Sequence, residues 1–192
     1  MRIISGKFKG KKINLPVDKT TRPLRDLVKE SLFNVIEHSN KININIKNSV
    51  ILDLFSGSGS FGLEALSRGA KKCLFVENYT KAFMSLNENI KKLKCHQSCL
   101  ISKLDCFEFI ENLRKNELKL DIIFLDPPYR EEKINFLIEE ILKKNILNKS
   151  GIIIIHRHRK DNIRITEKMN VIDLRLYGCL LYTSPSPRDG RE

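Results

Sequence analysis

Two short segments of the sequence contain residues whose types and spacing could bind a ligand and act on it. The first is Asp53-Leu54-Phe55-Ser56-Gly57-Ser58-Gly59, which joins a short apolar run to a helical pattern. The second is Asp126-Pro127-Pro128-Tyr129, which follows an apolar run that begins at Ile122. Polar groups that follow buried parallel strands gather at the sheet edge where α/β proteins bind ligands. The two segments therefore predict one shared site.

The second segment offers hydrogen-bond acceptors to an amino group. Two successive prolines remove two backbone donors and stiffen the turn. The carboxylate of Asp126 and the carbonyl of Pro127 can then both accept from one NH2 group, and Tyr129 can stack on the ring that carries it. We therefore predict that Asp126, Pro127, Pro128 and Tyr129 are catalytic residues acting on the exocyclic amino group of a base.

The glycine-rich segment leaves two cofactor classes open. Gly57, Gly59 and Gly62 fit the Gly-x-Gly-x-x-Gly spacing of dinucleotide-binding turns, so a nicotinamide or flavin cofactor is compatible with the glycines. Asp53 favours the other class, because a carboxylate there would bind a cationic or amino-bearing ligand rather than a pyrophosphate. S-adenosylmethionine carries an ammonium, a sulfonium and no phosphate, so it fits better. The predicted cofactor residues here are Asp53, Phe55, Ser56, Gly57, Ser58 and Gly59.

Two further acidic residues are predicted to end the next strands along the chain. Glu77 can accept hydrogen bonds from two ribose hydroxyls, which suits either cofactor class. Asp105 is placed to accept from an adenine amino group. Each has a neighbour that we include in the cofactor site, Asn78 and Cys106 respectively.

The elements that must position these residues alternate between strands and helices. Apolar runs predict strands at 50–55, 73–77, 99–105, 122–126, 152–155 and 171–176. Apolar residues at helical spacing predict helices at 28–36, up to Leu66, and at 82–93, 107–113 and 134–142. This alternation indicates an α/β fold with a mostly parallel sheet and helices on both faces. Gly151 is expected to open the strand at 152–155.

Positive charge is concentrated at the start of the chain. The protein has 192 residues and a formal net charge of +12, and residues 1–30 hold nine lysines and arginines against three acidic residues. Such clustering favours a contact with a polyanion over general compositional drift. Residues 2–14 alternate around Gly6 and Gly10, which indicates a short hairpin before the first helix. The residues predicted to bind a nucleic acid are Lys7, Lys9, Lys11, Lys12, Arg22 and Arg25.

The composition excludes several other classes of protein. Hydrophobic residues make up 41% and charged residues 30%, which is typical of a globular chain. No apolar run approaches the roughly 20 residues of a membrane span, and the first residues lack the apolar stretch of a signal peptide, so we expect a cytoplasmic protein. The five cysteines form no Cys-x-x-Cys pair. We therefore expect reduced thiols and no metal site.

The glycine-rich segment from Asp53 and the Asp126-Pro127-Pro128-Tyr129 segment resemble those of the amino-methyltransferase superfamily, whose signature is (Asp/Asn)-Pro-Pro-(Tyr/Phe). Four other segments are similar to the bacterial 16S rRNA guanine-N2 methyltransferase family. The resemblance covers residues 1 to about 178. The four segments are Met1-Arg2-Ile3-Ile4-Ser5-Gly6-Lys7-Phe8-Lys9-Gly10, Thr21-Arg22-Pro23, Leu32-Phe33-Asn34 and Gly62-Leu63-Glu64-Ala65-Leu66-Ser67-Arg68-Gly69-Ala70.

The resemblance implies a Rossmann-like class I fold that binds S-adenosylmethionine, with a short hairpin and helix added at its N-terminus. It implies direct methyl transfer to guanine N2 of 16S rRNA, in an assembled or assembling small subunit. We expect a basic RNA-facing extension at residues 1–40, a methyltransferase domain at 41–178 and a monomer. The family's sheet ends in a hairpin whose last strand inserts between two others.

The sequence departs from the family pattern at three places. Leu24 replaces a small polar residue, and His156 stands where the family usually has a carboxylate. Residues 179–192 resemble the translation of a sequencing adapter, so we expect a non-native tail there. The last strand would then have to form from residues 179–183.

Three alternative functions remain open from the residues themselves. An adenine-N6 DNA methyltransferase shares the Asp-Pro-Pro-Tyr motif but usually needs an added target-recognition region. An NAD-dependent oxidoreductase would explain the glycines and Glu77, but not the segment from Asp126 to Tyr129. A non-catalytic RNA-binding protein would explain only the charge.

Overall fold

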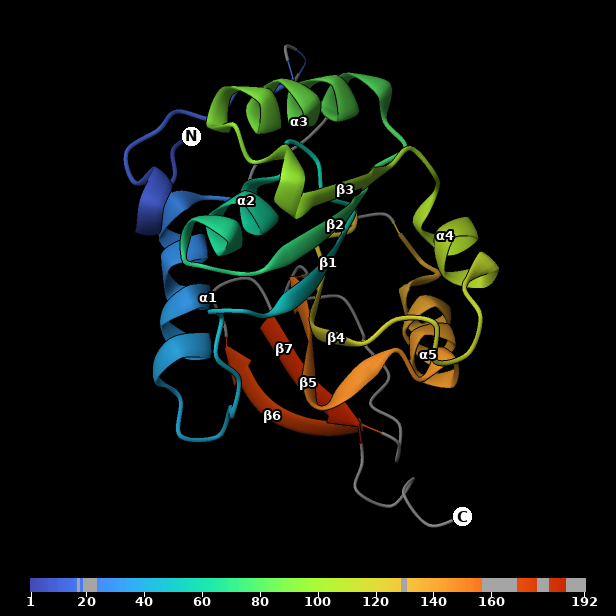
Figure 1. The fold of residues 1–192 in the computed structure, drawn as a ribbon. Helices are drawn as coiled ribbons and strands as arrows, with labels where there is room; N and C mark the ends of the chain where they lie inside the picture. Colours follow the sequence, from blue (N-terminus) through green and yellow to red (C-terminus); the bar gives the residue numbers. More distant parts are fainter. Residues whose placement is uncertain (17, 19–23, 129–130, 157–168, 176–179, 186–192) are drawn as a thin grey trace.

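A seven-stranded sheet forms the middle of the protein (Figure 1). The structure is a computed structural model that describes residues 1–16, 18, 24–128, 131–156, 169–175 and 180–185. The strand order is β3-β2-β1-β4-β5-β7-β6, with β1 to β5 parallel and β7 antiparallel to both of its neighbours. The strands are β1 (Val50–Leu54), β2 (Lys72–Val76), β3 (Cys99–Ser102), β4 (Leu120–Leu125), β5 (Leu147–His156), β6 (Met169–Arg175) and β7 (Leu180–Pro185).

Helices cover both faces of this sheet, as the alternating pattern predicts. Two short 3-10 turns, η1 (Gly6–Phe8) and η2 (His96–Ser98), complete the elements. In Figure 1 the first three α-helices lie on one side of the sheet and the last two on the other. The α-helices are α1 (Asp26–His38), α2 (Ser60–Ser67), α3 (Thr80–Leu93), α4 (Cys106–Asn112) and α5 (Ile134–Lys144).

The apolar strands build two cores because their side chains alternate between the faces. In β4, Ile122 and Phe124 join the cluster beneath α1, α2 and α3, whereas Ile123 and Leu125 join the cluster beneath α4 and α5. The ring of Phe61 in α2 stacks on Phe124 with centroids 4.0 Å apart. Continuous apolar runs are therefore what a sheet buried on both faces requires.

Two predicted strand boundaries are wrong. The strand expected at 99–105 ends at Ser102, because Asp105 instead begins α4 as its N-cap. The strand expected to open at Gly151 begins earlier, at Leu147, and its register against β4 shifts between Leu120 and Ile122. A Cβ on Gly151 would lie 2.9 Å from the carbonyl oxygen of Leu120, so this irregular stretch has no room for a side chain.

The two last strands form the hairpin that the resemblance implies. β7 lies between β5 and β6, and the pairing of β6 with β7 extends to Met169 and Pro185. The strand expected at 171–176 is confirmed as far as Arg175, while Leu176 lies outside the described residues. That residues 179–192 are a non-native tail stays a prediction, as does the division at residue 40.

The N-terminal segment folds back as a loose hairpin, as predicted. Arg2 and Lys12 form an antiparallel bridge, and the amide of Ile3 donates to the carbonyl of Lys11 at 2.9 Å. The turn at η1 presses on the end of α2: a Cβ on Gly6 would lie 1.9 Å from the carbonyl oxygen of Ser67. Only glycine fits there, so the contact fixes the position of the hairpin.

A buried ion pair joins this segment to the sheet domain. The carboxylate of Glu64 in α2 is fully buried and accepts from the amides of Ile4 at 2.8 Å and Ser5 at 2.9 Å. The ammonium group of Lys29 in α1, also fully buried, lies 3.6 Å from Glu64 and donates to the carbonyl of Arg2 at 2.7 Å. Burial lowers the pKa of Lys29, and the charges of Glu64 and Asp26 oppose that shift.

Replacing Glu64 should therefore destabilise the whole protein. In Glu64→Ala the buried ammonium group of Lys29 loses its buried partner and keeps the more exposed Asp26, 3.7 Å away, which costs about 3–5 kcal/mol. Urea unfolding measures the loss. Glu140→Ala is the control, because its partner Lys143 is 60% exposed, and loss of this pair should change the free energy of unfolding by about 0–1 kcal/mol. Equal losses in the two variants would contradict a structural role for the buried pair.

Candidate cofactor and catalytic site

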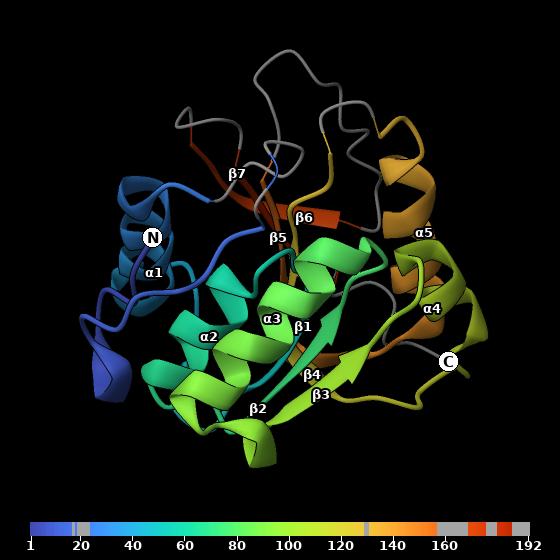
Figure 2. The same ribbon diagram turned by 90° about the horizontal axis from the view of Figure 1, so that it is seen from above.

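The carboxyl ends of four parallel strands bring the predicted residues to one edge of the sheet. Leu54, the last residue of β1, pairs in register with Val76 in β2 and with Leu125 in β4. The residues that follow these strands are therefore level with one another. Figure 2 shows the arrowheads of β2 and β3 pointing toward the same side.

The glycine loop between β1 and α2 has a packed side and an open side. A Cβ on Gly59 would lie 2.5 Å from the side chain of Leu86, and one on Gly62 would lie 2.4 Å from the ring of Phe75. These two glycines therefore let the loop and α2 pack closely. Gly57 has φ +56°, and its Cβ would meet nothing within 4 Å. Gly57 is thus the glycine that borders open space, where a ligand could lie against the backbone.

Asp53 presents an unpaired acceptor beside this loop. It is 1% exposed, and its Oδ2 accepts from the amide of Gly62, in the first turn of α2, at 2.9 Å. Its Oδ1 is buried and has no hydrogen-bond partner among the described residues. An orphaned buried acceptor is costly, so an ammonium or amino group of a ligand would fit this position.

The site concentrates negative charge. Burial raises the pKa of Asp53 well above its usual range; the hydrogen bond from Gly62 opposes this shift, and the negative charges of Asp126 and Glu77 add to it. Burial also raises the pKa of Glu77, against the hydrogen bonds that its carboxylate accepts. Three carboxyl groups thus interact at one edge, an environment that favours a cationic ligand.

Glu77 is held by the backbone on either side of it. Its Oε2 accepts from the amide of Gly57 at 2.7 Å, and its Oε1 accepts from the amide of Tyr79 at 2.8 Å. Each carboxylate oxygen has a second lone pair that can accept from a hydroxyl group. These bonds therefore fix the orientation of Glu77 and leave its carboxylate able to accept hydrogen bonds from a ligand.

Asp105 does not end a strand, as was predicted, but caps α4, and its contact with an adenine amino group stays a prediction. Its Oδ1 accepts from the amide of Phe107 at 2.8 Å, as the N-cap of α4. Its Oδ2 accepts from the side chain of Asn78 at 3.1 Å, so the structure brings these two predicted residues together. Cys106 contributes its side chain to the core, where Sγ accepts from the amide of Phe55 at 3.2 Å. Only the backbone of Cys106 is suited to a ligand.

One residue that supports the loop was not predicted from the sequence. Asn89 in α3 is 1% exposed, and its side chain donates to the carbonyl of Ser58 at 3.0 Å and to that of Asn14 at 2.9 Å. Ser56 is fixed separately, by donating to the carbonyl of Val76 at 3.2 Å. The one signal for Asn89 was an amide beside Ile90, on the apolar face of an amphipathic helix.

The Asp-Pro-Pro segment follows β4 at the same edge. Asp126 is partly buried, and its Oδ1 lies 2.8 Å from Nδ1 of His156 at the end of β5. Pro127 is buried and Pro128 is exposed, while Tyr129 lies outside the described residues. Asp126 and the glycine loop are therefore neighbours across the β1–β4 pair, as predicted.

The predicted RNA-binding lysines do not all lie beside this site. Lys7 belongs to η1, which packs at the C-terminal end of α2, and α2 starts at the site and runs away from it. Lys7 and Lys9 therefore lie near the end of α2 that is farther from the site, and an RNA contact by these residues stays a prediction. Arg25 immediately precedes α1, and Arg22 lies outside the described residues.

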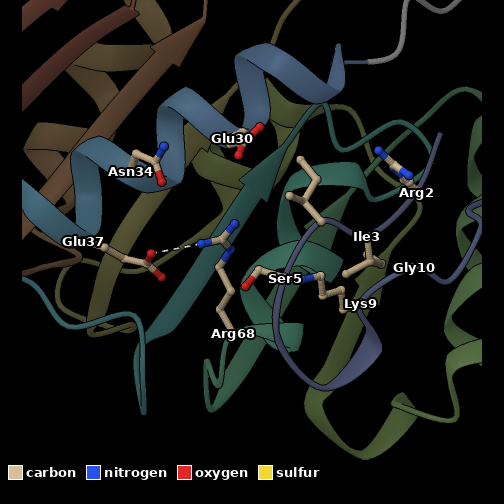
Figure 3. Close-up of a pocket in the computed structure, with 10 residues that line it drawn as sticks. Arg2, Ile3, Ser5, Lys9, Gly10, Glu30, Asn34, Glu37 and Arg68 are labelled. Atoms are coloured by element: carbon tan, nitrogen blue, oxygen red, sulfur yellow. Dashed lines mark hydrogen bonds and ion pairs between the residues drawn. The ribbon is translucent and has the colours of Figure 1, made fainter.

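A separate surface pocket lies beside the N-terminal hairpin. It has a volume of about 520 Å³ and is lined by both basic and acidic side chains, with Arg68 paired to Glu37 (Figure 3). Because side chains of both charges line it, this pocket is not a uniformly basic surface. None of its lining residues belongs to the predicted cofactor or catalytic sets.

Two features are absent from the described part of the chain. No group of three or more His, Cys, Asp or Glu residues there is arranged to hold a metal ion. No helix there is both long and apolar enough to cross a membrane.

The sheet order, the glycine loop and the acidic strand ends define the class I, Rossmann-like methyltransferase fold, as expected. The chain belongs to the family described as Conserved hypothetical protein 95, whose profile matches residues 1–184. It is 36% identical over 160 residues to the putative rRNA methyltransferase YlbH of Bacillus subtilis, covering 83% of this chain and 84% of that one.

Other relatives agree with this membership. Ribosomal RNA small subunit methyltransferase D of Buchnera aphidicola subsp. Baizongia pistaciae is 36% identical over 172 residues, covering 90% of this chain and 83% of that one. Among solved structures, a putative methyltransferase, yhhF, from Escherichia coli superposes with a TM-score of 0.78 at 26% identity, covering 95% of each chain. The resemblance read from the motifs is confirmed.

Filling the open side of the loop should abolish cofactor binding. In Gly57→Val the new side chain would enter the space that borders the loop. Calorimetric titration with S-adenosylmethionine should then show no measurable binding. Gly10→Val is the matched control, because Gly10 also has a positive φ and open space but lies outside the site. Unchanged affinity in a folded Gly57→Val protein would contradict the assignment.

Cofactor binding should also release protons from the site. Burial raises the pKa of Asp53, and a cation bound beside it would lower that pKa, so binding should release protons over the pH range in which Asp53 of the ligand-free protein titrates. Titrations in buffers of different ionisation enthalpy measure this release, which should be smaller in Asp53→Asn.

The same shift has a consequence for stability. Because the folded-state pKa of Asp53 is raised, this residue's contribution to stability is greatest below about pH 4, the ordinary aspartate pKa, and decreases as the pH rises toward the folded value. Asp53→Asn should remove that part of the pH dependence in thermal melts. Two results together would contradict the assignment of Asp53 to the cofactor site. The heat of cofactor binding would not depend on the buffer, and the thermal melts of Asp53→Asn would keep the pH dependence of the wild-type protein.

Proposed function

We propose that this chain transfers a methyl group from S-adenosylmethionine to the N2 amino group of a guanine in 16S rRNA. The proposal depends above all on the buried Asp53 carboxyl, which lies beside both the glycine loop and Asp126 and whose Oδ1 has no hydrogen-bond partner among the described residues. This juxtaposition offers one subsite to a cation and another to an amino group. The names of the relatives supply the substrate class, since several are rRNA small subunit methyltransferases.

The residues of the cofactor subsite fit a ligand with cationic and hydroxyl groups. S-adenosylmethionine, when bound, supplies a methyl group on a positively charged sulfur. Asp53 would accept from its ammonium group, and Glu77 would accept from its ribose hydroxyls. Asp105 and the backbone of Cys106 would bind the adenine ring. Gly57 leaves the backbone open on the ligand side.

The catalytic residues would orient the attacking nitrogen. The lone pair of an exocyclic amino group is delocalised into the ring and points away from a donor above the plane. Hydrogen bonds accepted by the Asp126 carboxylate and the Pro127 carbonyl would draw the nitrogen toward tetrahedral geometry. Stacking by Tyr129 would hold the base. Positioning and electrostatics then supply most of the rate enhancement, without a covalent intermediate.

The acidic environment also weighs against the oxidoreductase alternative. A dinucleotide would bring a pyrophosphate to a loop bordered by Asp53, Glu77 and Asp126, where its charge would be repelled. The alternative function, adenine-N6 methylation of DNA, would use the same Asp-Pro-Pro segment. An assay that offers RNA and DNA as substrates is therefore needed to distinguish it from the proposed function.

The partner follows from the reaction. We propose 16S rRNA within an assembled or assembling small subunit as the substrate, with the enzyme acting as a monomer in the cytoplasm. The base must be accessible in a loop or flipped out of its helix. The predicted RNA contacts are phosphate contacts by Lys7, Lys9, Lys11, Lys12, Arg22 and Arg25.

One experiment tests the proposed function. The protein is incubated with methyl-labelled cofactor and unmodified 16S rRNA, unmodified small subunits or DNA, and the products are digested to nucleosides. We expect label in N2-methylguanosine from the RNA or the subunits and none in the DNA. Label in N6-methyladenine of DNA, or no label in any nucleic acid, would overturn the proposal.

Removing the Asp126 carboxylate should affect turnover far more than cofactor binding. Asp126→Ala should lower single-turnover methyl transfer by roughly 10²–10³, the range seen when a positioned group aimed at the transition state is lost. Asp126→Asn retains an acceptor oxygen, so its rate of methyl transfer should fall less. Near wild-type turnover in Asp126→Ala would show that Asp126 does not orient the amino group.

A further inference from the structure

His156 contacts Asp126 at the edge of the sheet. Leu125 pairs in register with Ile155, so Asp126 and His156 are the next residues of two adjacent parallel strands. Nδ1 of the imidazole lies 2.8 Å from Oδ1 of Asp126. The side chain of His156 is 16% exposed and that of Asp126 is 25% exposed, so both reach the surface of the site while remaining largely shielded from water.

The backbone of His156 is fixed from two sides. β5 pairs with β4 on one side, and on the other His156 itself pairs with Leu180 of β7. The imidazole is therefore attached to an interior strand and not to a loop. A hydrogen-bond donor anchored in this way can restrict the rotation of a neighbouring carboxylate, which otherwise turns freely about its last bond.

The geometry also determines which hydrogen bond is possible. A carboxylate accepts hydrogen bonds and cannot donate them, so a contact of 2.8 Å requires the proton to be on Nδ1. Among the described residues, His156 is the one side chain that is hydrogen-bonded to Asp126. The bond occupies Oδ1 and leaves Oδ2 available to a ligand.

We propose that His156 is a positioning residue for methyl transfer. By donating from Nδ1 to Oδ1, it fixes the plane of the Asp126 carboxylate so that Oδ2 accepts from the target amino group. This inference rests on the proposed function, because it assigns His156 a role in the same reaction. It requires the imidazole to act through Asp126, without touching the base or the cofactor.

A matched pair of variants isolates the hydrogen bond. The amide nitrogen of asparagine can occupy the position of Nδ1, so His156→Asn keeps a donor, whereas His156→Leu has a similar size and none. We expect His156→Leu to lower kcat by about 10- to 100-fold, the range expected when a reacting group is slightly misplaced. KM for RNA and the Kd for cofactor should stay unchanged, and His156→Asn should restore most of the lost kcat.

The protonated nitrogen provides a second measurement that does not depend on activity. Long-range ¹H–¹⁵N spectra of the imidazoles, assigned with His156→Asn, should show His156 with its proton on Nδ1. In Asp126→Ala this preference should disappear. A proton found only on Nε2 in the wild-type protein would overturn the inference.

The outcomes separate the two proposals. If the wild-type protein methylates 16S rRNA but His156→Leu and His156→Asn have equal kcat values, positioning by His156 is overturned and the proposed function stands. If the wild-type protein methylates no nucleic acid, the proposed function fails and the catalytic role of His156 fails with it. If His156→Leu and His156→Asn lose stability and kcat to the same extent, the role of His156 is structural and the inference is wrong.

Discussion

The parallel alignment of β1, β2, β4 and β5 is the constraint on which the site depends. Each strand carries its predicted site residue at or just beyond its carboxyl end, so the in-register pairing of Leu54 with Leu125 sets the distance between the cofactor and catalytic segments. Buried apolar side chains on both faces keep that register, because a slip by one residue would exchange the two cores. The packing that stabilises the fold therefore also aligns the chemistry.

Most of the sheet domain could be predicted from the sequence because its patterns are local. Apolar runs of strand length, amphipathic helices and a glycine turn each follow from a few neighbouring residues. Asp53, Glu77 and Asp126 could be assigned to one edge because parallel strands place their carboxyl ends together. Where a local pattern was ambiguous, the prediction failed: Asp105 looked like the end of a strand but caps α4.

The contacts between distant segments could not be predicted in the same way. Nothing in the sequence near Lys29 shows that its ammonium group would be buried against Glu64, 35 residues away. The path of the N-terminal hairpin, which carries Lys7 away from the site, depends on the close fit of Gly6 against Ser67. The pairing of His156 with Asp126 likewise needed the register of β4 and β5, which no single segment specifies.

The position of β7 has a consequence for the order of events during synthesis. β7 follows β6 in the chain but lies between β6 and β5, so β6 cannot join the sheet until β7 has emerged. Until then the strand that carries His156 has an open edge, which invites pairing with other chains. Such late, non-local closure slows folding and lengthens exposure to aggregation. A chain that ends before β7 would thus keep the predicted cofactor residues but expose an unprotected strand.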